Sequence, residues 1–250
     1  MKILEYGKGK ERTFLLVQAS CMAVNLWEEN IQELQKDFHL IVPIIPGHCD
    51  PEGRDFTDVE SISKELEEDL LSMGMDHVDG AYGLSMGGSL LIKMLDHGRI
   101  SMDKVILDGA ITPYGYPKWI CRLIGIRDYL QGKLFASNKK FTLKMLQHYG
   151  YSPEAADKFF DALHSMSGTT LYNVFYSCNN YTLDHVPLDH GHILYMYGEK
   201  EKRARKKDLV NVKKFFPHVT FDELKGRDHG QFSGVEYDAF CAYVKNYMNA

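Results

Sequence analysis

The sequence predicts an α/β protein with a mainly parallel sheet, helices on both faces and an all-helical insertion between two strands. Segments with strand character alternate with segments of helical periodicity, which is typical of parallel sheets connected by helices. From about residue 111 to residue 189 the alternation stops and only helical segments follow one another. We therefore expect a sheet domain over residues 1–110 and 190–250 and a helical cap over residues 111–189.

The expected strands are short apolar runs bounded by turn residues. In chain order they are Lys2–Tyr6, Phe14–Gln18, His39–Ile44, Val78–Tyr82, Lys104–Leu107, His192–Tyr197 and Val219–Leu224. Apolar residues at helical spacing predict the helices of the sheet domain. These are Trp27–Leu34, a helix that Asp58 caps and that carries Ile62, Leu66 and Leu70, Ser89–Leu95, one helix between the last two strands, and Tyr237–Tyr247.

The insertion contains four expected helices and no convincing strand. They are Pro117–Ile126, Asn138–His148, Pro153–Met166 and Thr169–Cys178. Ser152 followed by Pro153 is a favourable helix start, because serine caps the first N–H groups and proline suits the first helical position. The four segments together predict a helical layer that is set on the sheet domain.

Composition is that of an ordinary globular protein, with 250 residues, 44% apolar and 25% charged. The net charge of −5 gives no reason to expect nucleic acid as a partner. The five cysteines are scattered and odd in number, which favours a reducing, cytoplasmic location over a disulfide framework. The apolar stretch before Cys21 is too short for a secretion signal, and we expect no membrane span because no run of about 18 apolar residues exists.

The segment Gly83-Leu84-Ser85-Met86-Gly87 lies between an expected strand and an expected helix. A G-x-S-x-G in this context places serine in a cramped turn, and the glycines are needed where a Cβ would clash. The turn exposes the hydroxyl, and the N–H groups of the following helix point at an oxyanion that develops beside it. Ser85 is therefore the candidate nucleophile, in preference to a simple helix-capping role.

Serine needs a base within hydrogen-bond reach and an acid that orients that base. His229 stands in the glycine-flanked loop Gly226–Gly230 directly after the last expected strand. Glu201 follows the preceding strand, three residues after Gly198. Loops at the carboxyl ends of parallel strands gather at one edge of a sheet. The order serine, glutamate, histidine along the chain therefore predicts a catalytic triad.

With these residues the chain resembles an α/β-hydrolase with a helical cap over nearly its whole length. The matching segments are the Ser85 turn, Ile45-Pro46-Gly47-His48 and Asp228-His229-Gly230. The resemblance implies that the backbone N–H groups of Met86 and Ser20 form the oxyanion hole. It departs from the family at Gln18-Ala19, where many members have His-Gly, and at Glu201, where aspartate is usual. Asp108 is the alternative acid, because certain lipases take their acid from that strand.

Two polar segments admit a functional and a plain interpretation. Lys200–Lys207 holds six basic residues in eight and could attract an anionic substrate or a phosphate-bearing carrier, but a solvated loop and helix start is favoured. Asp184–His192 is rich in histidine and aspartate, but it lacks the i, i+4 helical pairing of metal ligands. We therefore expect no metal and no cofactor.

The insertion holds 14 of the 30 aromatic residues of the chain. Most are expected to pack the cap itself, and some to wall the acyl pocket. We take Trp119, Tyr116 and Phe175 as the candidate pocket residues. An aromatic wall favours a small apolar or aromatic substrate over a sugar or a peptide.

These inferences predict a serine hydrolase that cleaves a small-molecule carboxylic ester through an acyl-enzyme on Ser85. Three alternatives share the architecture: a thioesterase or acyltransferase acting on a carrier-bound acyl group, a lyase of the hydroxynitrile type, and a non-catalytic ligand-binding relative. The sequence does not indicate an oligomeric state.

Overall fold

The computed structural model describes residues 1–188, 190 and 192–250. These residues form one seven-stranded sheet with the order β1-β3-β2-β4-β5-β6-β7. Its strands are β1 Ile3–Tyr6, β2 Thr13–Val17, β3 His39–Pro43, β4 His77–Leu84, β5 Ser101–Asp108, β6 Ile193–Gly198 and β7 Thr220–Leu224. Only β1 pairs antiparallel, with β3; every other pairing is parallel. The predicted mainly parallel sheet is confirmed.

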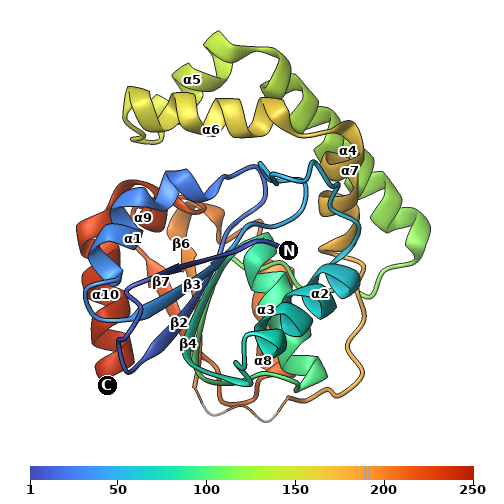
Figure 1. Cartoon of the computed structure of the whole chain (residues 1–250). Coiled ribbons are helices and arrows are strands. Elements are labelled where there is room, and N and C mark those ends of the chain that lie inside the picture. Colours follow the sequence, from blue (N-terminus) through green and yellow to red (C-terminus); the bar gives the residue numbers. More distant parts are fainter. Residues whose placement is uncertain (189, 191) are drawn as a thin grey trace.

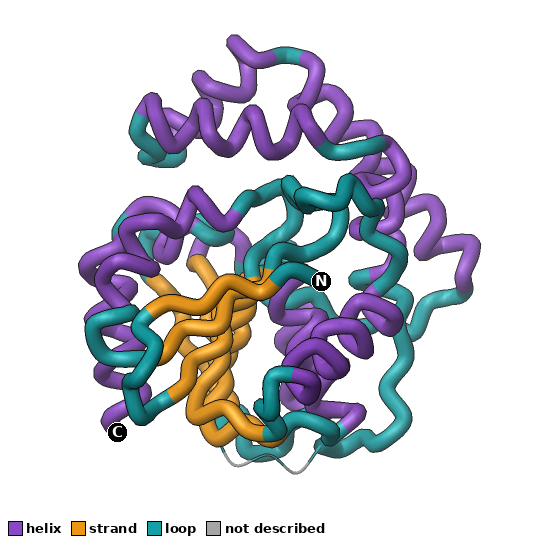
Figure 2. Tube along the Cα trace, in the orientation of Figure 1, coloured by secondary structure: helices purple, strands orange, loops and turns teal. Residues whose placement is uncertain are grey.

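Helices cover both faces of the sheet (Figures 1 and 2). One face carries η1 Val24–Trp27, α1 Glu28–Leu34, α9 Gln231–Val235 and α10 Tyr237–Asn249, and the other carries α2 Val59–Ser72, α3 Met86–His97 and α8 Lys206–Phe215. Each face has its own apolar core, and alternate residues of the same strand supply the two cores. Phe14 and Leu16 of β2, for example, pack toward α10, whereas Leu15 packs toward α3.

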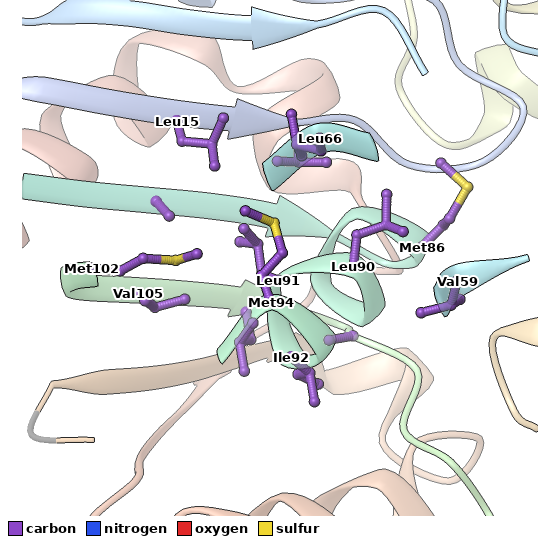
Figure 3. Packing of buried hydrophobic residues seen from close by; sticks show 14 of the residues in the cluster. Leu15, Val59, Leu66, Met86, Leu90, Leu91, Ile92, Met94, Met102 and Val105 are labelled. Atoms are coloured by element: carbon purple, nitrogen blue, oxygen red, sulfur yellow. The ribbon is translucent and has the colours of Figure 1, made fainter. Parts of the chain in front are cut away.

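The core beneath α3 fixes the start of that helix. Leu90, Leu91 and Met94 are fully buried and lie near Leu15 and Leu66 in the same cluster (Figure 3). Asp58 caps α2, as predicted, because its side chain accepts a hydrogen bond from the N–H of Ser61 at 2.8 Å. Rigid packing on both sides of α3 holds the turn that precedes it.

Four helices lie between β5 and β6, and we call them the helical insertion: α4 Lys118–Ser137, α5 Lys139–His148, α6 Pro153–Ser165 and α7 Gly168–Ser177. In Figure 1, α5 and α6 lie apart from the sheet, and α4 and α7 run side by side. The last predicted cap residue, Asp189, lies outside the described residues.

Helix α4 is longer than predicted, since it continues past Ile126 to Ser137. Gly125 and Gly132 weaken helix propensity, but both lie against α7. A Cβ at Gly125 would lie 3.2 Å from Tyr176, and one at Gly132 would lie 3.0 Å from Leu171. The two glycines therefore allow α4 and α7 to pack closely. This packing outweighs the low helix propensity of glycine.

Candidate active site

Ser85 occupies a tight turn between the end of β4 and the first residue of α3, with φ 53° and ψ −110°. A positive φ is uncommon for a residue with a side chain, and the surrounding structure must hold it. A Cβ at Gly87 would lie only 2.3 Å from the carbonyl oxygen of Val17, and one at Gly83 would lie 2.6 Å from the backbone of Gly87. The glycines of the motif are therefore required by the close approach of the backbone.

His229 and Glu201 come from the loops after β7 and β6, and their side chains meet. The Nδ1 atom of His229 lies 2.7 Å from Oε2 of Glu201. The other carboxylate oxygen, Oε1, accepts a hydrogen bond from the N–H of Gly198 at 2.9 Å. Arg205 adds a longer ion pair, with its Nε 3.5 Å from Oε2. The carboxylate is thus held from three sides, and it holds the imidazole.

The electrostatic environment favours the charged forms of this pair. Burial raises the pKa of Glu201, but the charge and hydrogen bond of His229, together with Arg205 and the Gly198 N–H, bring it below its ordinary value. Burial lowers the pKa of His229, but the charge and hydrogen bond of Glu201 outweigh this and raise it. A carboxylate beside an imidazole of raised pKa is suited to stabilise the imidazolium that forms when histidine accepts a proton.

Asp108, the alternative acid, has a different partner. It is 2% exposed at the end of β5, and its Oδ2 accepts a hydrogen bond from the Tyr82 hydroxyl at 2.6 Å. Burial raises the pKa of Asp108 to about 7, although the Tyr82 hydrogen bond acts in the opposite direction. Of the two candidate acids, it is therefore Glu201 that bonds the ring of His229.

Gly109 is a site residue that the sequence reasoning missed. It has φ +52°, and a Cβ there would lie 2.6 Å from Nδ1 of His229. The same atom would lie 3.2 Å from Oε1 of Glu201. Its only signal in the sequence is its position directly after Asp108, where the strand ends.

The two expected oxyanion donors come from the start of α3 and from the loop after β2. Met86 is the first residue of α3, and N–H groups of the first turn have no acceptor within their helix. Ser20 lies in the loop after β2 and lines the same cavity as Ser85. Gln18 braces this loop, because its Nε2 donates to the carbonyl oxygen of Met22 at 2.9 Å.

Ser85 and His229 open into one cavity of about 340 Å³. Most of its other wall residues are apolar or aromatic, and the helical insertion supplies many of them. The cavity is lined by Ala19, Ser20, Met22, Leu84, Ser85, Gln131, Phe135, Met145, Leu146, Tyr149, Tyr151, Phe159, Asp228, His229, Gly230 and Gln231. Among these described residues Asp228 is the only carboxylate, and none is lysine or arginine.

The predicted pocket residues require a correction. Tyr116 and Phe175 line a second cavity of about 660 Å³, and Trp119 is 62% exposed on the outer side of α4. The insertion does supply aromatic walls to the Ser85 cavity, but these are Phe135, Tyr149, Tyr151 and Phe159. Residue type predicts aromatic walls, whereas the rotation of each helix decides which rings face the serine.

The basic run Lys200–Lys207 borders the second cavity through Arg203–Lys207. Lys207 lies over the ring of Tyr116, with its Nζ 4.0 Å from the ring centroid. Arg205 turns inward instead, donates to the carbonyl oxygen of Gly109 at 3.3 Å and approaches Glu201. The run is therefore solvated for the most part, as expected, except for Arg205.

The histidine- and aspartate-rich segment lies partly outside the described residues, which omit Asp189 and Gly191. Its described part is tied to α3. The N–H groups of Asp184 and His185 both donate to the carboxylate of Asp96, each at 2.9 Å. These contacts anchor the chain as it leaves the insertion.

Comparison with known proteins identifies the fold. No protein-family model matches the sequence, and no curated protein matches it. A protein from Desulfitobacterium hafniense assigned to the α/β-hydrolase family is similar in structure, with TM-score 0.77, 18% identity, and coverage of 99% of this chain and 100% of that one. A thermophilic esterase from Thermogutta terrifontis gives TM-score 0.75 and 17% identity, over 99% and 92% of the two chains. The epoxide hydrolase CorEH gives TM-score 0.73 and 15% identity, over 99% and 94%.

This chain therefore has the α/β-hydrolase fold, as the sequence predicts. The similar structures include an esterase and an epoxide hydrolase, so the fold is compatible with more than one reaction. The reaction has to be argued from the residues at the site.

Proposed function

We propose that this protein is a serine hydrolase that cleaves small apolar or aromatic carboxylic esters by acyl transfer. The observation that carries the proposal is the shared cavity of Ser85 and His229, with the Nδ1 of His229 bound to Glu201. The positive φ of Ser85 supports it, because strain at a turn between strand and helix is the hallmark of a nucleophile in this fold.

In the proposed reaction, His229 accepts the proton of Ser85 as the hydroxyl oxygen attacks the ester carbonyl. The carbonyl oxygen becomes an oxyanion, and the backbone N–H groups of Met86 and Ser20 stabilise it. The imidazolium then protonates the leaving alcohol as the C–O bond breaks. A water molecule, deprotonated by His229, then attacks the acyl carbon. The imidazolium returns this proton to Ser85 Oγ as its bond to the acyl group breaks and the carboxylic acid leaves, while Glu201 stabilises the imidazolium in both steps.

The cavity supports a small, uncharged acyl group. A space of about 340 Å³ with four aromatic walls and no lysine or arginine among its described lining residues offers mainly apolar contact and no fixed counter-charge for an acidic substrate. The cationic second cavity shares none of its described lining residues with it. This separation favours a free ester over an acyl group on a phosphate-bearing carrier.

Labelling with a fluorophosphonate, followed by mass spectrometry, tests the nucleophile directly. We expect one adduct on Ser85 and none in Ser85→Ala, whose kcat should fall on the order of 10³-fold or more with little change in thermal stability. Ser72→Ala, which removes an exposed serine hydroxyl at the end of α2, is the control and should label normally. An unlabelled wild-type protein, or a Ser85→Ala variant that keeps a tenth of the activity, contradicts the proposal.

Nitrophenyl esters and thioesters of increasing acyl length then define the substrate. We expect the highest kcat/KM for short or aromatic acyl groups on an oxygen ester, with a steep decline once the acyl chain exceeds the cavity. A clear preference for coenzyme A thioesters over oxygen esters would replace this substrate class with a carrier-bound one.

A further inference from the structure

Helix α4 exposes large apolar side chains along one face. Trp119, Leu123, Ile126, Leu130 and Leu134 recur at intervals of three or four residues, and we call this set the α4 stripe. Their exposed fractions are between 45% and 62%. Elsewhere the exposed large apolar residues occur singly or in pairs, such as Val210 and Phe221, whereas here five lie on one helical face. A contiguous patch of this kind marks an interaction surface.

The orientation of α4 is fixed by its opposite face. Cys121, Gly125 and Gly132 are its buried residues, and the two glycines pack against α7. The helix thus turns its small residues inward and its large apolar residues outward. This is the reverse of an ordinary amphipathic helix at a protein surface, whose apolar face points to the core.

The charged residues around the α4 stripe indicate the kind of surface that it contacts. Residues 118–148, which span α4 and α5, hold seven Lys or Arg and one Asp, a formal charge of +6 in a chain of net −5. The rest of the chain therefore carries −11. Arg122 and Lys133 fall along one edge of the stripe, on a helix of 3.6 residues per turn, and Arg127 falls along the other. Arg127 pairs with Asp128, and Lys139 of α5 pairs with Asp157 of α6, whereas Arg122 and Lys133 have no ion pair within the described residues.

We propose that the α4 stripe docks this protein on the surface of a membrane that contains anionic lipids. An apolar stripe with a tryptophan and flanking lysines and arginines lies in the interface of a bilayer, with its apolar side chains among the acyl chains and its cations among the headgroups. The described residues contain no helix long and apolar enough to span a bilayer, so the contact is peripheral. The proposal does not depend on the reaction catalysed at Ser85.

A second copy of this chain suits the surface less well. A two-fold contact would set the +6 segment of one copy against the same segment of the other, and like charges would then face each other. An anionic bilayer matches both the apolar stripe and its charge.

Helix α4 also supplies part of the wall of the Ser85 cavity. Gln131 and Phe135 line that cavity and are the neighbours in sequence of Leu130 and Leu134. Tyr149 lines it too and is 37% exposed. The cavity wall and the α4 stripe thus share one helix but lie on different faces of it.

The test is flotation of the whole chain with vesicles of equal parts phosphatidylcholine and phosphatidylglycerol, beside vesicles of phosphatidylcholine alone. We expect binding to the mixed vesicles that weakens as salt is added, and much weaker binding to the neutral ones. Trp119 gives an independent signal in the unmodified protein, because Trp27 is only 1% exposed. Its emission should shift to shorter wavelength on binding.

Two variants separate the apolar and the charged contributions. Leu123→Glu with Leu130→Glu should weaken binding to mixed vesicles about 100-fold or more, whereas Val210→Glu, at an equally exposed position on α8, should not. Arg122→Gln with Lys133→Gln should weaken it about 10- to 30-fold, and Lys10→Gln should leave it unchanged.

Three outcomes would overturn the proposal. The first is no preference of the wild type for the mixed vesicles, and the second is unaltered binding by the Leu123→Glu, Leu130→Glu variant. The third is a lipid-free dimer in sedimentation that these two substitutions dissociate, which would assign the stripe to a second copy of the chain.

Discussion

Two carboxylates stand at the ends of neighbouring strands, Asp108 after β5 and Glu201 after β6, and their environments differ sharply. Both lie within the electrostatic reach of His229. Glu201 bonds the ring nitrogen of His229, a backbone N–H and a nearby arginine, and its pKa is lowered despite burial, which acts to raise it. Asp108 accepts a hydrogen bond from the Tyr82 hydroxyl, and burial raises the pKa of Asp108 to about 7.

The difference shows that the supply of positive charge and N–H donors decides which acid stays ionised. A buried carboxylate keeps its charge only when donors or cations replace the water it has lost. Glu201 receives the N–H of Gly198 and the charge of Arg205, whereas the carboxylate of Asp108 receives the hydroxyl of Tyr82 from the neighbouring strand β4. We therefore propose that Glu201 orients the histidine and that Asp108 is a structural residue.

Glu201→Gln should have the largest effect on catalysis. The amide keeps the shape but cannot stabilise the imidazolium, so kcat should fall by about 10² to 10⁴ with the fold intact. Steady-state kinetics on a nitrophenyl ester and a circular dichroism spectrum would measure both. Glu201→Asp should lose activity too, because the shorter side chain lengthens the 2.7 Å bond to His229.

One result would assign the role of the acid to Asp108 instead. If Glu201→Gln keeps nearly full activity while Asp108→Asn loses most of its kcat, the acid comes from β5, and the contact between Glu201 and His229 is not needed for catalysis.

Gly109→Ala should have the next largest effect, because the new methyl group would lie 2.6 Å from Nδ1 of His229. Displacement of the ring should lower kcat/KM by about 10-fold or more, beyond any loss from backbone strain. Gly115→Ala is the matched control, since Gly115 also has a positive φ but has nothing within 4 Å of its Cβ position. Equal activity of the two variants would remove Gly109 from the positioning of His229.

The sequence predicts the fold well because local signals and tertiary structure agree there. Each expected strand is present within a few residues, and the caps at Asp58 and Ser152 form as expected. The exceptions lie where packing overrides local preference. Helix α4 runs through Gly125 and Gly132 to reach Ser137, and α9, with five residues, is too short to show a period.

The site is less predictable because its parts depend on different kinds of information. Ser85, Glu201 and His229 follow strand ends, and order along the chain is enough to propose them. The walls of the cavity depend on how each inserted helix is rotated, which composition does not reveal. The apolar residues of α4 illustrate this, since Trp119 faces outward while Phe135 lines the cavity.

Asp108→Asn should change activity by no more than a few-fold, and should change the pH dependence of stability instead. The pKa of Asp108 is raised from 3.8 to about 7 in the folded protein. Between those two values folding therefore takes up a proton, and stability falls as pH rises. Urea unfolding across this range should show the wild type losing free energy of unfolding relative to Asp108→Asn. Parallel curves for the two proteins would mean that Asp108 is not protonated in the native state.

The smallest effect concerns the pH profile of catalysis and the role of Arg205. Because Glu201 raises the pKa of His229 against burial, wild-type kcat/KM should rise with pH through a midpoint above about 6.5. Arg205 opposes this with a positive charge, so Arg205→Gln should move the midpoint further upward and lower activity at a fixed pH below it. Lys206→Gln removes an equal charge from the exposed neighbouring position and should leave the midpoint in place. A midpoint that moves equally in both variants would assign the effect to the general charge of the basic run, whereas a shift in Arg205→Gln alone would tie the histidine to this one inward-facing arginine.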